Sequence, residues 1–181
     1  IYDMIYIEVN MMEIEKWLND VLEKKNKRAM PIITFPAATK LNISVKKLIN
    51  DTDQQVAALK IIKEECNPLA ILGFMDLSVE AECFGAEIKV TDNEVPTVVG
   101  QLIEDEDDAQ ALKVPAVGSG RSQLYIDAIK KTKAEIKDIP ILGGCIGPFS
   151  LAGRLMDVSE AMINCYEEPE MVHIVLEKAT K

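Results

Sequence analysis

Residues 69–88 read LAILGFMDLSVEAECFGAEI, and this stretch decides the fold. It opens with a short apolar run, residues 69–74, that follows Asn67-Pro68. Runs of this length, bounded by turn residues, are typical of a buried strand. Residues 78–84 then predict a single short helix ending at Gly85, because glycine readily adopts the left-handed conformation that closes a helix. A buried strand followed by a helix predicts a βαβ unit.

Two further apolar runs extend this pattern along the chain. Residues 32–35, enclosed by prolines, and residues 140–146 each predict a buried strand. Helices are predicted between the three strands, at residues 52–66 and 120–137, the first with residues 52–55 as a capping box. Because strands alternate with helices, we expect a parallel sheet with right-handed crossovers, and the fold class is α/β.

The remaining segments predict smaller elements. Residues 13–28 predict an amphipathic helix before the first strand, and residues 169–179 predict the last helix. Residues 86–90 and 95–99 predict two short strands, a hairpin appended to the main sheet. The acidic run 104–108 fits either a solvated loop or the first turn of a helix.

Composition limits the classes of function that the chain can have. The formal net charge is −10 and 48% of the residues are apolar, so there is material for a core but no cationic face for nucleic acid or anionic lipid. No apolar run approaches the roughly 18 residues needed to cross a bilayer. Residues 1–9 carry two acids and no basic residue, unlike a signal peptide. The four cysteines form no Cys-x-x-Cys pair, and we expect a cytoplasmic protein without a disulfide framework.

Candidate site residues follow the predicted strands, because parallel α/β sheets bind ligands at the carboxyl ends of their strands. The loop after the second strand holds Asp76, and Glu80 follows four residues later on the same side of a helical turn. Two carboxylates there fit a site for a cationic substrate, a metal ion or a cationic intermediate. They also fit a structural arrangement in which Asp76 caps the short helix and Glu80 is solvated.

The loop after the third strand is the other candidate. Gly143-Gly144 and Gly147-Pro148 permit close backbone approach to a ligand, as they also permit a tight turn without one, and Phe149 follows them. Cys145, at the end of this strand, fits a small buried hydrophobe. His173 is the only histidine, and it fits a half-exposed position in the last helix better than a metal ligand. The sequence contains no Ser/His/Asp arrangement, P-loop or dinucleotide fingerprint.

Four segments carry a family likeness: MDLSVEAECFGAEI (75–88), EVPTV (94–98), PILGGCIGPFSLAG (140–153) and EPEMVH (168–173). Together they resemble the uroporphyrinogen decarboxylase / corrinoid-dependent methyltransferase superfamily. The resemblance spans roughly residues 12 to 181 and rests on the combination of these segments. Residues 1–10 have no counterpart in it, and Met11 or Met12 would then be the natural start.

The resemblance implies that residues 1–181 are one incomplete domain, the N-terminal part of a TIM (β/α)8 barrel. About three βα units would be present, with the small hairpin inserted after the second strand. Such a part-barrel leaves its third strand unpaired at one edge, and a homodimer would cover that edge. We expect this part of the barrel to be inactive by itself.

The resemblance also implies partners and a cofactor. The corrinoid branch moves a methyl group between a cobalamin protein and a thiol, tetrahydrofolate or methylamine-type partner. We therefore expect a corrinoid protein and a small methyl donor or acceptor as partners. The thiol-activating members hold zinc with a His-x-Cys pair and a later cysteine. His173 is followed by Ile174-Val175, so this chain has no metal site of that kind, and zinc is expected in the full-length protein from residues downstream.

The decarboxylase branch, with uroporphyrinogen as its substrate, is the alternative. It uses arginines after the first strand to hold propionates and an aspartate after the second, whose position Asp76 matches. Residues 34–44 contain Lys40 and no arginine, which favours methyl transfer. A non-catalytic module that binds a corrinoid protein is the second alternative. We predict a catalytic residue, Asp76, and four substrate-binding residues: Glu80, Gly147, Pro148 and Phe149.

Overall fold

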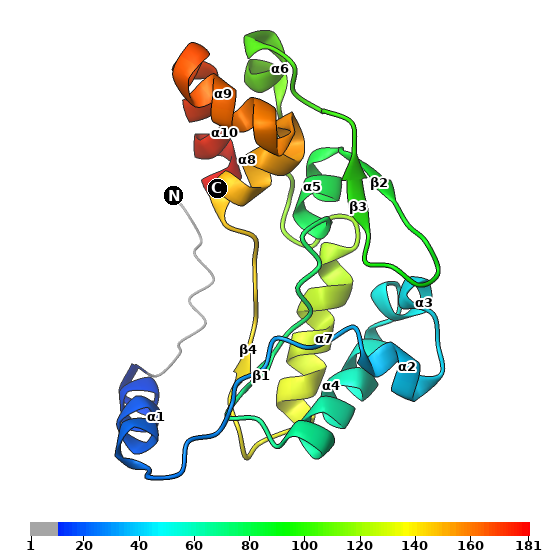
Figure 1. Ribbon diagram of the computed structural model, residues 1–181, viewed down its shortest axis with the longest axis vertical. Helices are drawn as coiled ribbons and strands as arrows, with labels where there is room; N and C mark the ends of the chain where they lie inside the picture. Colours follow the sequence, from blue (N-terminus) through cyan, green and yellow to red (C-terminus); the bar gives the residue numbers. More distant parts are fainter. Residues whose placement is uncertain (1–10) are drawn as a thin grey trace.

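A computed structural model of the protein describes residues 11–181, and predictions for residues 1–10 lie outside this part (Figure 1). Its helices and strands, in chain order, are α1 (Met11–Glu23), α2 (Ala37–Leu41), α3 (Val45–Ile49), α4 (Thr52–Cys66), β1 (Ile71–Leu72), α5 (Val79–Phe84), β2 (Glu87–Lys89), β3 (Thr97–Val99), α6 (Glu106–Ala111), α7 (Ser122–Glu135), β4 (Ile141–Leu142), α8 (Pro148–Met156), α9 (Val158–Glu167) and α10 (Pro169–Thr180). The α/β class predicted from the sequence is confirmed.

The second and third predicted strands form a short parallel pair. Ile71 of β1 lies opposite Ile141 of β4, and Leu72 lies opposite Leu142. Because the strands are parallel, the loops that follow them, beginning at Gly73 and Gly143, leave the sheet at the same end. This end is therefore the place to look for a ligand site.

The first predicted strand, residues 32–35, is absent, and this prediction was wrong. Ala29 accepts a hydrogen bond from the Leu69 backbone N–H at 2.7 Å, so the chain begins to run beside β1. The ladder does not continue, because the flanking prolines lack an N–H donor. Ile32 and Ile33 are 63% and 40% exposed, so burial does not hold this segment extended. Two of the three expected strands are thus present among the described residues.

One hydrophobic core lies beneath the parallel pair, in the lower half of Figure 1. It joins α2, α3 and α4 to β1, and its fully buried side chains include Leu48, Ile49 and Leu59. The predicted capping box of α4 is wrong: the helix is capped instead by Asp51, which accepts hydrogen bonds from the Asp53 and Gln54 N–H groups at 2.9 and 3.1 Å. Gln55 is therefore not a cap, and it is buried in this half of the molecule.

A second core joins α5, α6, α8, α9 and α10 in the upper half of Figure 1, with Leu155, Met156 and Val175 at its centre. The strands β2 and β3 pair antiparallel beside α5. The acidic run 104–108 leads into α6: Asp105 caps the helix and the next three acids occupy its first turn. Acids are favourable there, because the helix dipole places partial positive charge at this end.

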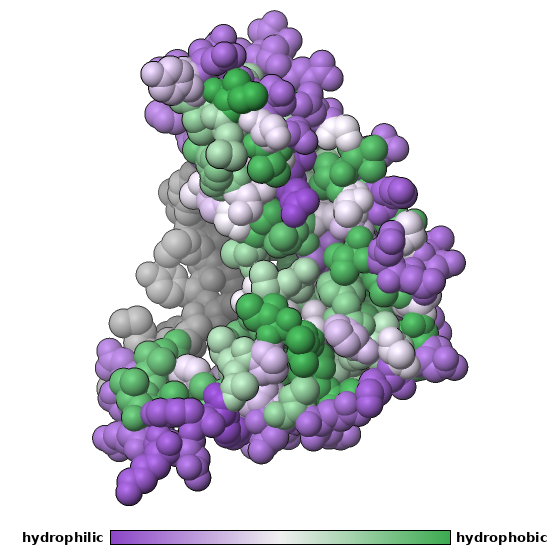
Figure 2. Space-filling view, in the orientation of Figure 1, coloured by the Kyte–Doolittle hydropathy of each residue, from purple (hydrophilic) through white to green (hydrophobic). Residues whose placement is uncertain are grey.

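Part of the apolar surface of residues 11–181 remains exposed. The helix α1 ends at Glu23 rather than Arg28, lies apart from the rest in Figure 1, and leaves Ile14, Leu18 and Leu22 exposed. Figure 2 shows further apolar residues gathered over the hollowed face between the two halves. No helix within residues 11–181 is both long and apolar enough to cross a membrane.

Candidate functional site

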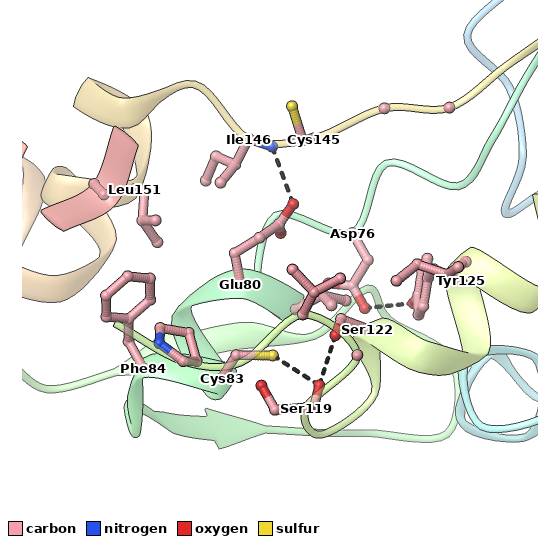
Figure 3. Close-up of a pocket in the computed structure, with 18 of the residues that line it drawn as sticks. Asp76, Glu80, Cys83, Phe84, Ser119, Ser122, Tyr125, Cys145, Ile146 and Leu151 are labelled. Carbon is pink, nitrogen blue, oxygen red and sulfur yellow. Dashed lines mark hydrogen bonds between the residues drawn. The ribbon is translucent and has the colours of Figure 1, made fainter. Parts of the chain in front are cut away.

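A cavity of about 640 Å³ opens where the loops after β1 and β4 emerge (Figure 3). Helix α5, the start of α7 and the loop 114–119 supply most of its remaining wall. The lining is largely apolar, and it includes Phe74, Val79, Phe84, Ile129 and Leu151. A concave, mainly apolar site with a few polar groups is the usual form of a small-molecule site.

Asp76 lies in this wall but is itself buried. Its Oδ1 accepts hydrogen bonds from the Ser78 backbone N–H at 3.0 Å and the Ser78 hydroxyl at 2.5 Å. Its Oδ2 accepts from Arg121 Nη1 at 2.7 Å and from the Tyr125 hydroxyl at 2.8 Å. A carboxylate has about four acceptor positions, so these four bonds use its capacity. Its bonds to Ser78 stabilise the turn before α5, but the N-cap of that helix is Ser78 and not Asp76, so the alternative in which Asp76 caps the helix was wrong.

Arg121 joins three parts of the site, immediately before α7. Its Nε donates to Glu82 of α5 at 2.5 Å, its Nη1 donates to Asp76, and its Nη2 donates to the Ser78 hydroxyl at 3.0 Å. Burial alone would lower the pKa of Arg121, but its hydrogen bond and attraction to Asp76, with the Glu82 hydrogen bond, outweigh burial and raise that pKa. We call Arg121, Asp76, Ser78, Glu82 and Tyr125 the Arg121 network.

Tyr125 completes this network from the first turns of α7. Its ring packs edge-on against Phe74, with ring centroids 6.4 Å apart, and its hydroxyl points to Asp76 (Figure 3). Burial, together with the neighbouring Asp76 carboxylate, raises the pKa of Tyr125 well above its usual value. The phenol is therefore a neutral hydrogen-bond donor at physiological pH.

The Tyr125 environment predicts a loss of stability in alkali. Because the folded-state pKa lies above the unfolded value of about 10, the contribution of Tyr125 is fully present below about pH 10 and is lost above it. Urea unfolding between pH 8 and 11 should therefore show the wild-type protein losing stability faster than Tyr125→Phe above that pH. The control is Tyr166→Phe, since Tyr166 is 94% exposed. Identical pH profiles for the two variants would show that Tyr125 is not the responsible group.

Glu80 is held differently from Asp76. It is partly buried on α5, and its Oε1 accepts a hydrogen bond at 3.1 Å from the Ile146 backbone N–H in the loop after β4. Its Oε2 has no hydrogen-bond partner among the described residues. Figure 3 shows the Glu80 side chain reaching from α5 toward this loop. Glu80 thus ties α5 to the loop after β4, and its second oxygen makes no hydrogen bond within the described residues.

The predicted site residues in the loop after β4 differ in their position relative to the cavity. Pro148 lines the cavity, whereas Gly147 and Phe149 are not among its lining residues, and Phe149 is 49% exposed. Gly147 has an extended backbone with φ of −71°, and an added Cβ would meet open space, so the fold itself does not require glycine there. Cys145 is exposed, so the expectation of a small buried hydrophobe was wrong.

Sequence reasoning missed Arg121 and Tyr125. Both lie 45 or more residues from Asp76, and no local spacing connects an arginine at a helix start to an aspartate after a distant strand. The available signal was weaker: Arg121 and Tyr125 both lie near the start of the helix predicted at residues 120–137. His173 is exposed on α10 and takes no part in the site.

Comparisons with known proteins agree with this architecture. Residues 24–181 match the family described as Uroporphyrinogen decarboxylase (URO-D). The methylcobamide:CoM methyltransferase MtbA of Methanosarcina acetivorans is 39% identical over 82 residues, which are 44% of this chain and 24% of that protein. The MtbA of Methanosarcina mazei is 34% identical over 82 residues, with the same shares covered.

A solved structure also has this fold. A methyltransferase from Methanosarcina mazei superimposes with a TM-score of 0.79 at 21% identity, over 92% of this chain and 52% of that chain. The match shows a shared fold, and this chain spans about half the length of that methyltransferase and a smaller share of the two curated relatives.

Proposed function

The chain belongs to the uroporphyrinogen decarboxylase (URO-D) family, and from this premise we propose that it forms part of a corrinoid-dependent methyltransferase. The enzyme would move a methyl group between a cobalamin carried by a partner protein and a thiol or tetrahydrofolate-type compound. Support comes from the relatives, which are named methylcobamide:CoM methyltransferases. The fold proposed for the whole protein is a TIM barrel, with β1 and β4 as neighbouring strands and the β2–β3 hairpin inserted after β1.

One observation carries the choice of methyl transfer over decarboxylation: the cavity offers no arginine to an anionic substrate. No arginine of residues 11–181 lines it, and the nearby Arg121 guanidinium is occupied by Asp76, Glu82 and Ser78. Lys40, in the loop 34–44, pairs with Glu65 at 3.0 Å. A porphyrinogen rich in carboxylates would instead meet Glu80, a like charge.

The residues of this chain would then have separate roles in the proposed reaction. Asp76 is a positioning residue: it fixes Arg121 and Tyr125, and through Ser78 it fixes the start of α5. Glu80 and Pro148 face the ligand. Phe149, exposed beside the cavity, would be offered to the larger corrinoid-carrying partner. Apolar walls exclude water and hold the reactants in a fixed geometry, which lowers the entropic part of the barrier.

Zinc does not fit the part of the chain that the structure describes. Within residues 11–181 no three His, Cys, Asp or Glu side chains are grouped so that they could hold a metal ion. We therefore assign no zinc ligand here and derive no step through zinc. In the proposed enzyme, zinc would be held by residues outside this chain.

The test is an assay of the full-length protein with methylcobalamin and a panel of thiols or tetrahydrofolate, following loss of the methylcobalamin spectrum. We expect demethylation that depends on one acceptor. Release of carbon dioxide from uroporphyrinogen without demethylation would replace the proposal with a decarboxylase. Binding of a corrinoid protein with neither activity would replace it with the non-catalytic module.

A further inference from the structure

Helix α1 presents a row of large apolar side chains to solvent. Ile14, Leu18 and Leu22 follow one another at four-residue spacing, so they lie along one face of the helix. They are 43%, 47% and 74% exposed, and the helix lies apart from the rest of the molecule in Figure 1. We call these three residues the α1 stripe. A helix of 13 residues gains most of its stability by packing its apolar face, so α1 is stabilised when another surface covers the stripe.

Helix α9 presents a second apolar row with the same spacing. Val158, Met162 and Tyr166 are 57%, 64% and 94% exposed, whereas Ala161 of this helix is buried in the upper core. We call the three exposed residues the α9 stripe. Both stripes extend over two four-residue steps, about 12 Å of helix, so the length of one fits the length of the other. Contiguous exposed apolar rows of this kind mark interaction surfaces.

Charged residues of opposite sign follow the two stripes. Lys24 and Lys25 come after the α1 stripe, whereas Glu167, Glu168 and Glu170 come after the α9 stripe. None of these five side chains makes an ion pair within the described part of the chain. When α1 lies beside α9 in the same direction, the lysines therefore meet glutamates. Two α9 stripes packed on each other would bring glutamates together, which is unfavourable.

The two stripes lie at opposite ends of one molecule. In Figure 1, α1 is at the lower end of the longest axis and α9 is at the upper end, so in this arrangement they do not meet within one chain. A second copy supplies the missing surface for each of them. The contact is then made twice, because α1 of each copy packs on α9 of the other. Such a reciprocal contact gives the closed two-fold symmetry that is commonest among soluble oligomers.

We propose that two copies of this chain associate by reciprocal packing of the α1 stripe on the α9 stripe, with Lys24 and Lys25 beside Glu167 and Glu168. This surface differs from the strand edge at which a homodimer was expected from the sequence. No residue of either stripe lines the cavity, so the association does not depend on the proposed reaction.

The test is sedimentation equilibrium of the full-length protein and of two variants, Leu18→Asp in the α1 stripe and Met162→Asp in the α9 stripe. We expect the wild-type protein to be a dimer and each variant to dimerise at least about ten-fold more weakly, because each contact would bury an aspartate. Val95→Asp is the matched control. Val95 is a 42% exposed apolar residue outside both stripes, and its substitution should change dimerisation by less than about two-fold.

Mixing the two variants tests whether the contact is reciprocal. A mixed dimer of Leu18→Asp with Met162→Asp has one contact that carries both substitutions and one that carries neither. We expect the mixed dimer to be at least about five-fold tighter than either variant alone, because one contact is intact and the two substitutions in the other act on the same surface.

Charge reversal tests the pairing of the two helix ends. Replacing Lys24 and Lys25 by glutamate should weaken the dimer about ten-fold, because like charges would then meet. The further replacement of Glu167 and Glu168 by lysine in the same chain should restore the dimer to within about three-fold of the wild-type affinity. All four positions are exposed, so the folded structure of each copy does not depend on them.

Several outcomes would overturn the proposal. A monomeric wild-type protein would mean that the stripes are covered within one chain. A dimer weakened by only one of the two aspartate substitutions would mean that like stripes pair, and a dimer weakened by neither would place the interface elsewhere. No gain on mixing the variants, or no recovery after the second charge reversal, would count equally against it.

Discussion

Replacing Arg121 by methionine is expected to lower the free energy of unfolding by about 3–5 kcal/mol. The Asp76 side chain is fully buried, and Arg121 is the cation that pairs with it at 2.7 Å. Methionine keeps much of the side-chain volume but leaves the Asp76 carboxylate without a counter-charge and leaves Glu82 without its ion-pair partner. Urea unfolding followed by circular dichroism gives the difference.

Lys130→Met is the matched control for this change. It also removes one positive charge from α7, but that side chain is 70% exposed, so we expect a change within about 0.5 kcal/mol. The double variant Arg121→Met with Asp76→Asn should recover part of the loss, because the uncompensated charge is then absent. If Arg121→Met were no more harmful than Lys130→Met, the network would not contribute to stability as described.

The parallel pair could be predicted from the sequence because a buried strand appears as a short run of apolar residues. Residues 69–74 and 140–146 are apolar runs set between amphipathic helices, and each contains a strand, although the strand is shorter than the run. The run 32–35 is also largely apolar, but Ile32 and Ile33 are exposed. Local composition cannot report whether a neighbouring element covers a segment, so this strand was predicted and does not form.

The position of Cys145 was misjudged for a related reason. Its run predicts a strand through residue 146, but β4 ends at Leu142, and the chain leaves the sheet at Gly143. Beyond that point the alternation of a strand no longer applies, and Cys145 is exposed while Ile146 is buried. The length of a strand depends on the neighbour that pairs with it, and β1 is equally short.

The candidate site was predicted at one end of the sheet, and the structure has a cavity there, but the contacts of its residues were not predicted. Asp76 and Glu80 could be singled out because each follows a strand at a fixed distance along the chain. Their roles depend on contacts made across the fold: Asp76 with Arg121, and Glu80 with the backbone of Ile146. Every residue except proline has a backbone N–H, so the Ile146 donor cannot be recognised from the sequence. No sequence pattern could therefore have distinguished Asp76, with four hydrogen bonds, from Glu80, with one among the described residues.

Phe74→Ala is expected to cost about 3–5 kcal/mol of unfolding free energy, the range for removing a buried phenylalanine. Phe74 is buried at the junction of the lower core and the cavity. Its ring packs edge-on against Phe35 at 5.6 Å between centroids and against Tyr125 at 6.4 Å. Alanine would leave a void that these two rings cannot both fill, and the wall that supports the Tyr125 hydroxyl would lose its packing.

The matched control is Phe149→Ala, since Phe149 is 49% exposed and makes no ring contact within the described residues. We expect it to cost about 1 kcal/mol or less. Chemical unfolding of both variants measures the difference, and near-ultraviolet circular dichroism should show loss of the fixed Tyr125 environment in Phe74→Ala only. If the two substitutions lowered the free energy of unfolding equally, the burial and ring contacts of Phe74 would contribute no more than an exposed side chain does. Phe74 would then not be the residue that joins the lower core to the cavity.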